Sequence, residues 1–200
     1  MNMIENENTD NSSVNSFNSF ENQKKQDTKN DKHHDHYISM KLQMIAELLN
    51  DICKENRKNS EDSMLLLKPF LSKKIPSISI VDYIKRLSKH SKVCDEIFVL
   101  VLIYLDRICA MYKVNLNYYN IHKLILASFI CSVKYLEDEY YSISHYAKIG
   151  GVSKTEMINL EYEFLSLLDF NLFIKEEIFN KYTNSLLNLE NSDDEDFVDY

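Results

Sequence analysis

Apolar residues recur along most of this chain at the spacing of an α-helix and not at the alternating spacing of a strand. From Tyr37 to about Lys54 they partly follow i, i+3, i+4 and i+7, which predicts an amphipathic helix that flanks the main domain. The same pattern predicts helices near 77–90, 95–113, 118–136, 142–149, 153–169 and 175–189. The 200 residues include only two Gly and two Pro, the residues that most often interrupt helices. We therefore predict an all-α fold.

Two of the predicted helices are apolar on nearly every side. The nine residues from Ile97 to Leu105 are all apolar, and the segment from Tyr118 to Leu136 has almost the same character. A helix that is hydrophobic all round is surrounded by protein, so we expect both at the centre of a helical bundle. The apolar run is too short to cross a bilayer, which takes about 20 residues.

Polar residues mark the predicted ends of several helices. Pro76 with Ser77 suits the start of one helix. The Gly-Gly pair at 150–151 provides the positive-φ freedom with which a helix ends. Ser153 and Glu156 have the spacing of a capping box at the start of the next helix.

Composition divides the chain into four parts. Residues 1–36 are rich in Asn and Ser and poor in large apolar groups, so we expect a disordered arm. Residues 37–74 hold the first helix and a polar linker, and residues 75–189 hold the main domain with its last helix. Residues 190–200 form an acidic tail, in which Ser192 followed by acidic residues is a candidate phosphorylation site.

Charge and cysteine usage narrow the functional classes. The formal net charge is −8, but six carboxylates lie in the last eleven residues, so the folded part is close to neutral. Without a concentrated Lys/Arg region, nucleic-acid binding and membrane binding are both disfavoured. The four cysteines lack CxxC spacing, so we expect reduced thiols in an intracellular protein. The first residues also lack the basic stretch and apolar run of a signal peptide.

Groups that perform catalysis are sparse. His90, His122 and His145 belong to no recognised local motif, and the acidic residues at 137–139 are typical of a solvated helix end. We interpret the tract KHHDH at 32–36 as polar composition and not as a metal site. The sequence therefore predicts no catalytic residue, no metal site, no cofactor and no enzyme activity.

Two charged residues break the apolar pattern of the predicted helices. Glu161 falls within the apolar arc of the helix over 153–169, and Lys134 aligns with apolar residues late in the helix over 118–136. Because an unpaired buried charge costs several kcal/mol, Glu161 either pairs within the domain or lies at the edge of a protein-binding surface. Lys134 either extends its amine to solvent or takes part in the same surface.

The chain resembles the single-box P-type cyclins, also called U-type, in the order of its motifs. These are PSISIVDYIKRLSKH, YLDR, VKYLED, HYAKIGG and NLEYEFL, and the match as a whole covers about residues 76–182. The resemblance implies a cyclin-box bundle of five helices, with one flanking helix before it and one after it. It also implies a regulatory subunit that binds and activates a cyclin-dependent protein kinase.

The resemblance assigns five residues to kinase binding. In cyclins a Lys late in the third helix and a Glu in the fifth contact the regulatory helix of the kinase, and Lys134 and Glu161 occupy those positions. Tyr135, Leu165 and Phe170 match apolar or aromatic neighbours of that contact, and a role in the core explains each of these three equally well.

A further cyclin feature is altered in this sequence. Cyclins usually pair the aspartate of YLDR, here Asp106, with an arginine of the first helix, but Ser77 stands at that arginine's position. We therefore expect an ion pair between Asp106 and Arg86, with Arg107 as the alternative. PSISI also replaces the patch that captures substrate motifs in cell-cycle cyclins, so we expect no substrate docking there.

Three functional hypotheses follow. The first is a kinase-activating cyclin that is a monomer when unbound and is located in the cytoplasm or nucleus. The second is a scaffold or transcription-type protein that uses the cyclin fold without activating a kinase. An all-helical enzyme with an unrecognised site is the third, and no residue pattern favours it.

Overall fold

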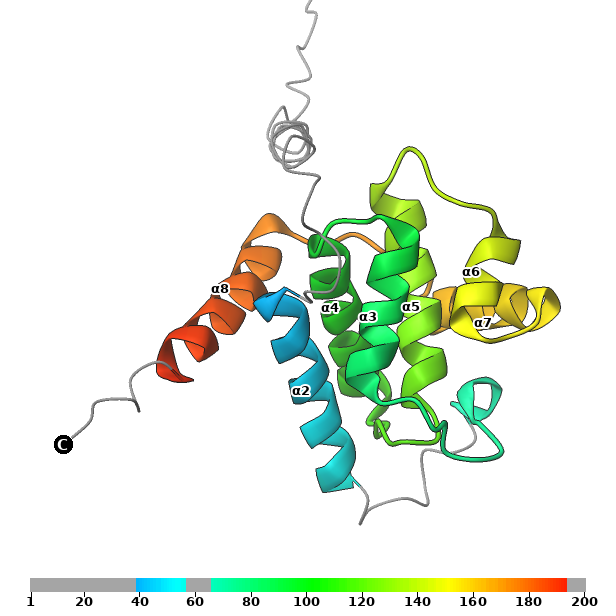
Figure 1. Cartoon of the computed structure of the whole chain (residues 1–200), viewed down its shortest axis with the longest axis horizontal. Helices are drawn as coiled ribbons and strands as arrows, with labels where there is room; N and C mark the ends of the chain where they lie inside the picture. The colour runs from blue at the N-terminus through cyan, green and yellow to red at the C-terminus, as the bar shows by residue number, and fades with distance from the viewer. Residues whose placement is uncertain (1–38, 57–65, 194–200) are drawn as a thin grey trace, which may run out of the picture. The chain divides into compact units, whose positions relative to one another are not determined.

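The computed structural model describes residues 39–56 and 66–193, with side chains as far as residue 188. Every regular element in those ranges is a helix, which confirms the all-α prediction (Figure 1). The α-helices are α2 (Met40–Glu55), α3 (Ile80–Ser91), α4 (Glu96–Tyr112), α5 (Ile121–Leu136), α6 (Ile143–Gly150), α7 (Lys154–Leu167) and α8 (Glu176–Asp193), and a short 3-10 helix, η2 (Lys68–Phe70), precedes α3. The arm predicted at 1–36 lies outside the described residues.

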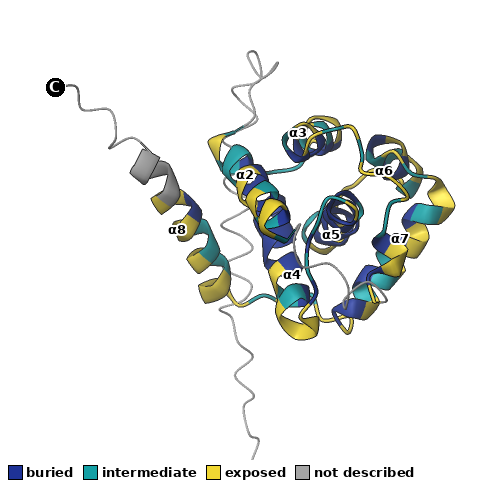
Figure 2. Ribbon diagram, turned by 90° about the horizontal axis from the view of Figure 1, so that it is seen from below, coloured by how far each residue is buried: buried dark blue, intermediate teal, exposed yellow. Residues whose placement is uncertain are grey.

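The two predicted apolar helices form the centre of the fold. Every residue from Ile97 to Leu105 in α4 and from Leu124 to Val133 in α5 is buried. α5 runs through the middle, with α3, α4, α6 and α7 around it (Figure 2). Burial on all sides agrees with the absence of a polar face in both sequences.

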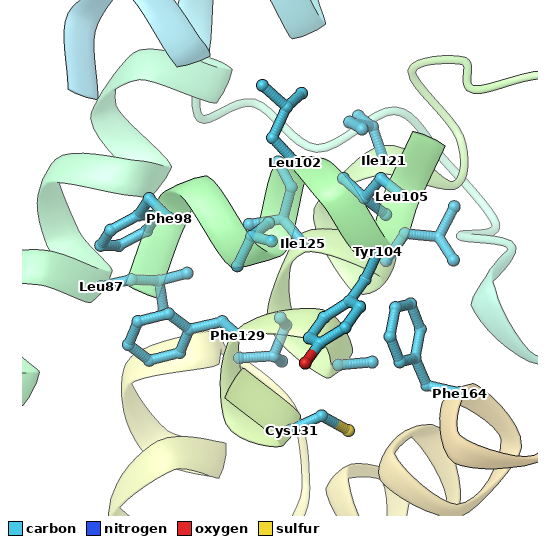
Figure 3. Close-up of a cluster of buried hydrophobic side chains, with 14 of the residues drawn as sticks. Leu87, Phe98, Leu102, Tyr104, Leu105, Ile121, Ile125, Phe129, Cys131 and Phe164 are labelled. Carbon is cyan, nitrogen blue, oxygen red and sulfur yellow. The ribbon is translucent and has the colours of Figure 1, made fainter. Parts of the chain in front are cut away.

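Large aromatic side chains fill the space around α5. The ring centroids of Phe98 and Phe129 lie 5.2 Å apart, and Tyr104 and Phe164 belong to the same cluster of buried side chains (Figure 3). The fully buried Tyr104 donates a 2.7 Å hydrogen bond from its hydroxyl to the carbonyl of Leu172. This bond satisfies the polar end of a side chain whose ring contributes apolar area to the core.

Serine caps set where α2, α3, α6 and α7 begin, and Ser39 is the cap of α2. Ser153 caps α7 by accepting from the backbone N–H three residues later, as the sequence indicates, and Ser142 caps α6 in the same way. The prediction for α3 was wrong by a few residues, because Ser79 and not Ser77 is its cap. The Oγ of Ser79 accepts from the backbone N–H of Asp82 at 3.0 Å.

The Gly-Gly pair has two different roles. Gly151 has φ 74° and ends α6 in the left-handed conformation, as predicted. Gly150 is still helical, and a Cβ there would lie 2.4 Å from the Cδ2 of the fully buried Leu126. The missing side chain at Gly150 therefore lets α6 approach α5 closely.

α2 flanks the bundle, as predicted, and adds its apolar face to the core. It packs against α3, α4 and α8, and Ile45 and Leu49 are fully buried. An ion pair of 3.0 Å joins Lys41 to Glu96 at the start of α4. α2 is thus tied to the bundle by apolar burial and by one partly buried ion pair.

The expected ion pair between Asp106 and Arg86 is replaced by other contacts. Asp106 accepts a 2.5 Å hydrogen bond from the hydroxyl of Tyr182 in α8. Arg86 instead donates to the carbonyl of Lys148 at the end of α6. Arg107, the alternative partner, donates to backbone carbonyls in the segment 171–173. Asp106 of α4 is therefore bonded to α8, the last helix, and not to α3, the first helix of the cyclin box.

Tyr182→Phe tests this attachment. Losing the hydrogen bond to Asp106 should lower the free energy of unfolding by about 1 kcal/mol. Burial, followed by the contact with Asp106, raises the pKa of Tyr182 to about 12. Because an unfolded tyrosine titrates near pH 10, this stabilisation is complete below about pH 10 and is lost as the pH rises through the folded pKa. Urea unfolding of both proteins at neutral and alkaline pH measures the effect.

Tyr119→Phe is the matched control, because Tyr119 is exposed. Its free energy of unfolding should stay within about 0.5 kcal/mol of that of the native chain. A Tyr182→Phe protein as stable as the native chain at neutral pH would contradict the role given to Asp106.

His122 holds the segment that leads into α3. Its ring is buried, Nε2 donates to the carbonyl of Ile78 at 3.0 Å, and Nδ1 has no hydrogen-bond partner among the described residues. The Tyr83 ring packs edge-on against the imidazole at 5.1 Å. Burial lowers the pKa of His122, so the folded protein keeps this imidazole neutral.

His122→Gln should reduce the loss of unfolding free energy that occurs as the pH falls below neutrality. With the folded pKa below the unfolded value of about 6.5, the unfolded chain takes up a proton first, and stability falls as the pH decreases below that value. Glutamine retains an N–H donor but does not titrate. The free energies of unfolding of both proteins, measured by urea titration from about pH 7 to pH 5, should diverge. Parallel curves would show that His122 has no part in the acid response.

Candidate partner-binding surface

Lys134 and Glu161 form an ion pair between α5 and α7. The two helices pack against each other, and the last turn of α5 brings the Lys134 Nζ to 2.5 Å from the Glu161 Oε1. The sequence left open whether Glu161 pairs within the domain or borders a protein-binding surface. The structure pairs it with Lys134.

The pair lies at the surface of the bundle and is not sealed inside it. The Lys134 side chain is 34% exposed and that of Glu161 is 15% exposed. An ion pair in this position remains accessible, because one side of each charged group still faces solvent. Both of the alternatives raised for Glu161 are therefore compatible with its position.

An apolar stripe runs along α7 beside Glu161. Ile158, Tyr162 and Leu165 follow the i, i+4, i+7 spacing of one helical face. Ile158 is 47% exposed and Tyr162 is 62% exposed, whereas Leu165 is half-buried and packs against the core. Large apolar groups gathered on one exposed face are typical of a protein-binding surface.

Phe170 extends the stripe beyond the end of α7. Its backbone N–H donates to the carbonyl of Leu165 at 2.8 Å, and its φ of 54° turns the chain away from the helix axis. The ring is 60% exposed and packs edge-on against that of Tyr162, with centroids 6.3 Å apart. The two aromatic rings therefore present one continuous area.

Tyr135 is the aromatic residue on the α5 side. It follows Lys134 directly, and it is 37% exposed. We define the α5–α7 surface as Lys134, Tyr135, Ile158, Glu161, Tyr162 and Phe170. Sequence reasoning singled out four of these. It missed Ile158 and Tyr162, because apolar residues at i, i+4 and i+7 with Leu165 have the same spacing as a face that packs into the core.

The other polar groups considered in the sequence make local contacts. His145 contacts the carbonyl of His90 through Nε2 at 2.8 Å, and it stacks on the Tyr141 ring. No cluster of three metal-binding side chains occurs within residues 39–56 and 66–188. The tract at 32–36 and the side chain of Ser192 lie outside the described residues. Among the described helices, none combines the length and apolar character needed to cross a membrane.

Comparison with known proteins places this arrangement in a family. The family profile described as Cyclin matches residues 5–172. PHO85 cyclin-7 of Saccharomyces cerevisiae is 34% identical over 166 residues, which are 72% of this chain and 58% of that protein. PHO85 cyclin-like protein psl1 of Schizosaccharomyces pombe is 36% identical over 160 residues, 73% of this chain and 66% of that protein.

A plant relative is similar over a comparable share of this chain. Cyclin-U4-1 of Arabidopsis thaliana is 32% identical over 151 residues, which are 75% of this chain and 72% of that protein. The chain thus spans less than two thirds of the two yeast relatives and more of the plant one. Given the matching profile, the relatives and the all-helical bundle, the chain belongs to the cyclin family and, within it, to the P-type or U-type group.

Proposed function

We propose that this chain is the regulatory subunit of a cyclin-dependent protein kinase, which it binds through the α5–α7 surface. The observation that carries the proposal is the accessible Lys134–Glu161 pair bordered by exposed aromatic rings. Membership of the cyclin family and the similarity to PHO85 cyclin-7 and PHO85 cyclin-like protein psl1 support the proposal. Within this proposal the chain contributes no catalytic group and is an intracellular monomer when unbound.

The α5–α7 surface has the composition of an interaction site. Tyr162 and Phe170 offer large, rigid ring areas that are exposed in the unbound chain. Aromatic anchors of this kind carry much of the energy of protein interfaces, because burying them releases water at a small loss of side-chain entropy. Tyr135 on α5 and Ile158 on α7 are further exposed apolar side chains of these two helices.

The Lys134–Glu161 pair orients the charges of this surface before a partner arrives. Each group restrains the other, so less side-chain freedom is lost when a helix of the partner packs across them. Partly exposed charges also add specificity, since a partner helix needs complementary groups at matching positions. The pair therefore serves both to join α5 to α7 and to select the partner.

The kinase is activated if the α5–α7 surface binds its αC helix only in the position that this helix has in the active kinase. In the active kinase, a Glu of αC pairs with the Lys that positions the ATP phosphates. Shifting a kinase from about 1% to about 99% active requires roughly 5.5 kcal/mol of differential affinity. An interface of standard size, about 1,600 Å² in total, supplies this much.

A charge exchange at the ion pair tests the proposal. Lys134→Glu combined with Glu161→Lys retains an internal pair, and so the fold, but reverses the charges that a partner meets. We expect affinity for a cyclin-dependent kinase catalytic subunit to fall about tenfold to a hundredfold. Calorimetric titration measures the affinity, and phosphate transfer to a protein substrate measures activation.

Lys54→Ala with Asp51→Ala is the matched control, because this exposed pair of 2.7 Å lies on α2. It should leave kinase affinity unchanged. If the exchanged pair binds as tightly as the native chain, the α5–α7 surface is not the binding site. Binding without increased phosphate transfer would favour the second hypothesis, a cyclin-fold scaffold.

A further inference from the structure

The segment that joins η2 to α3 is irregular, exposed and cationic. Residues 71–79 belong to no helix or strand, and Lys73, Lys74 and Ser77 within them are exposed. Between residues 68 and 81 the sequence has three lysines and no acidic residue. Within the described ranges, no ion pair engages Lys73 or Lys74. Both amines are therefore available to another molecule.

Two hydrogen bonds fix the ends of this segment and leave its middle unbonded. The backbone N–H of Ser72 donates to the carbonyl of Tyr119 at 2.8 Å, and the carbonyl of Ile78 accepts from His122 at 3.0 Å. Between these two points, the backbone of residues 73–77 makes no hydrogen bond to any other described residue. The middle of the segment can thus enter the substrate cleft of an enzyme without the loss of a backbone hydrogen bond.

Ser77 differs from the other described serines that lie outside the helices. Four of those use their hydroxyls to cap α2, α3, α6 and α7, and Ser72 is half-buried. Ser77 is exposed, and its hydroxyl makes no hydrogen bond to another described residue. Its Oγ can therefore be modified without removing a helix cap or opening the core.

There is also space beside Ser77 for an added group. A cavity of about 310 Å³ is lined by residues 75–80 together with Asn50, Tyr118 and His122. This lining, within the described part of the chain, includes no Lys, Arg, Asp or Glu. A phosphate on the Ser77 Oγ would add a charge of about −2 and three acceptor oxygens at the edge of this cavity. The modification would thus make an uncharged cavity anionic.

From the charge pattern, the exposure and the unbonded hydroxyl we propose that Ser77 is a phosphorylation site for a kinase that selects basic residues before the acceptor serine. Lys73 and Lys74 precede Ser77 by four and three residues, and this pattern complements a substrate cleft lined by carboxylates. The inference goes beyond the proposed function and does not depend on it, because Ser77 is not part of the α5–α7 surface.

The chemical step is an ordinary phosphoryl transfer from ATP. The Ser77 Oγ forms a bond to the γ-phosphorus, and the bond from that phosphorus to the ADP oxygen breaks. The hydroxyl proton passes to the catalytic Asp of the modifying kinase. ADP and the phosphorylated chain are the products.

Phosphorylation of the full-length chain tests the site. Thr28 and Ser60 also follow cationic residues and lie outside the described residues, so a chain with Thr28→Ala and Ser60→Ala is the reference protein. It is incubated with ATP, Mg²⁺ and either of two kinases that select basic substrates, cyclic-AMP-dependent protein kinase or protein kinase C. At least one of these should add a phosphate that site-resolved mass spectrometry places on Ser77. Adding Ser77→Ala to the reference protein should remove this phosphate.

Removal of the two lysines tests how the kinase selects Ser77. Lys73→Ala with Lys74→Ala, made in the reference protein, should lower kcat/KM for phosphorylation of Ser77 at least about tenfold. Lys85→Ala with Lys148→Ala is the matched control, because it removes the same charge from exposed positions of α3 and α6. It should change kcat/KM less than about twofold. Thermal melts verify that each variant is folded at the assay temperature.

Two results would contradict the proposal. If neither kinase places phosphate on Ser77 of the folded reference protein, the segment is not a kinase substrate. If the chain without Lys73 and Lys74 is phosphorylated on Ser77 as fast as the control, these lysines do not direct the kinase. Both results leave the test of kinase binding unaffected, because that test exchanges the charges of Lys134 and Glu161.

Discussion

Burial of α4 and α5 on all sides is the constraint on which the rest of the domain depends. Neither helix has a polar face, so each must be enclosed by other elements before it is stable in water. The remaining helices pack their apolar faces against α4 and α5. The outer faces of these surrounding helices are exposed and can bind other molecules. The α5–α7 surface lies where α5 leaves this enclosure, so that its last turn brings Lys134 to solvent beside Glu161.

Local chemistry explains why most helices could be predicted from the sequence. The caps at Ser142 and Ser153 and the left-handed Gly151 act within a few residues of the ends that they define. The start of α3 was less predictable, because Ser77 and Ser79 are both suitable caps. A residue that is distant in the sequence contacts the start of this helix, since His122 donates a hydrogen bond to the carbonyl of Ile78 just before α3 begins.

The charged residues of the candidate site could be predicted because they interrupt the apolar pattern of two helices. Lys134 and Glu161 are charges in otherwise apolar helical arcs, and this anomaly identified them before any contact was known. Their pairing distance, and the exposed ring of Tyr162 beside them, depend on how α5 and α7 pack. Asp106 was assigned the wrong partner because nothing in the sequence sets which helix covers it. Tyr182, its actual partner, is 76 residues away along the chain.

The packing of α8 against α2 has a consequence for the order in which the protein folds during synthesis. α2 is the first described helix to emerge from the ribosome and α8 is the last, yet they are neighbours in the native domain. Until α8 emerges, part of the apolar face of α2 and the carboxylate of Asp106 lack their native contacts. Contacts between such distant segments form late, so we expect the nascent chain to complete its fold only after α8 has been released.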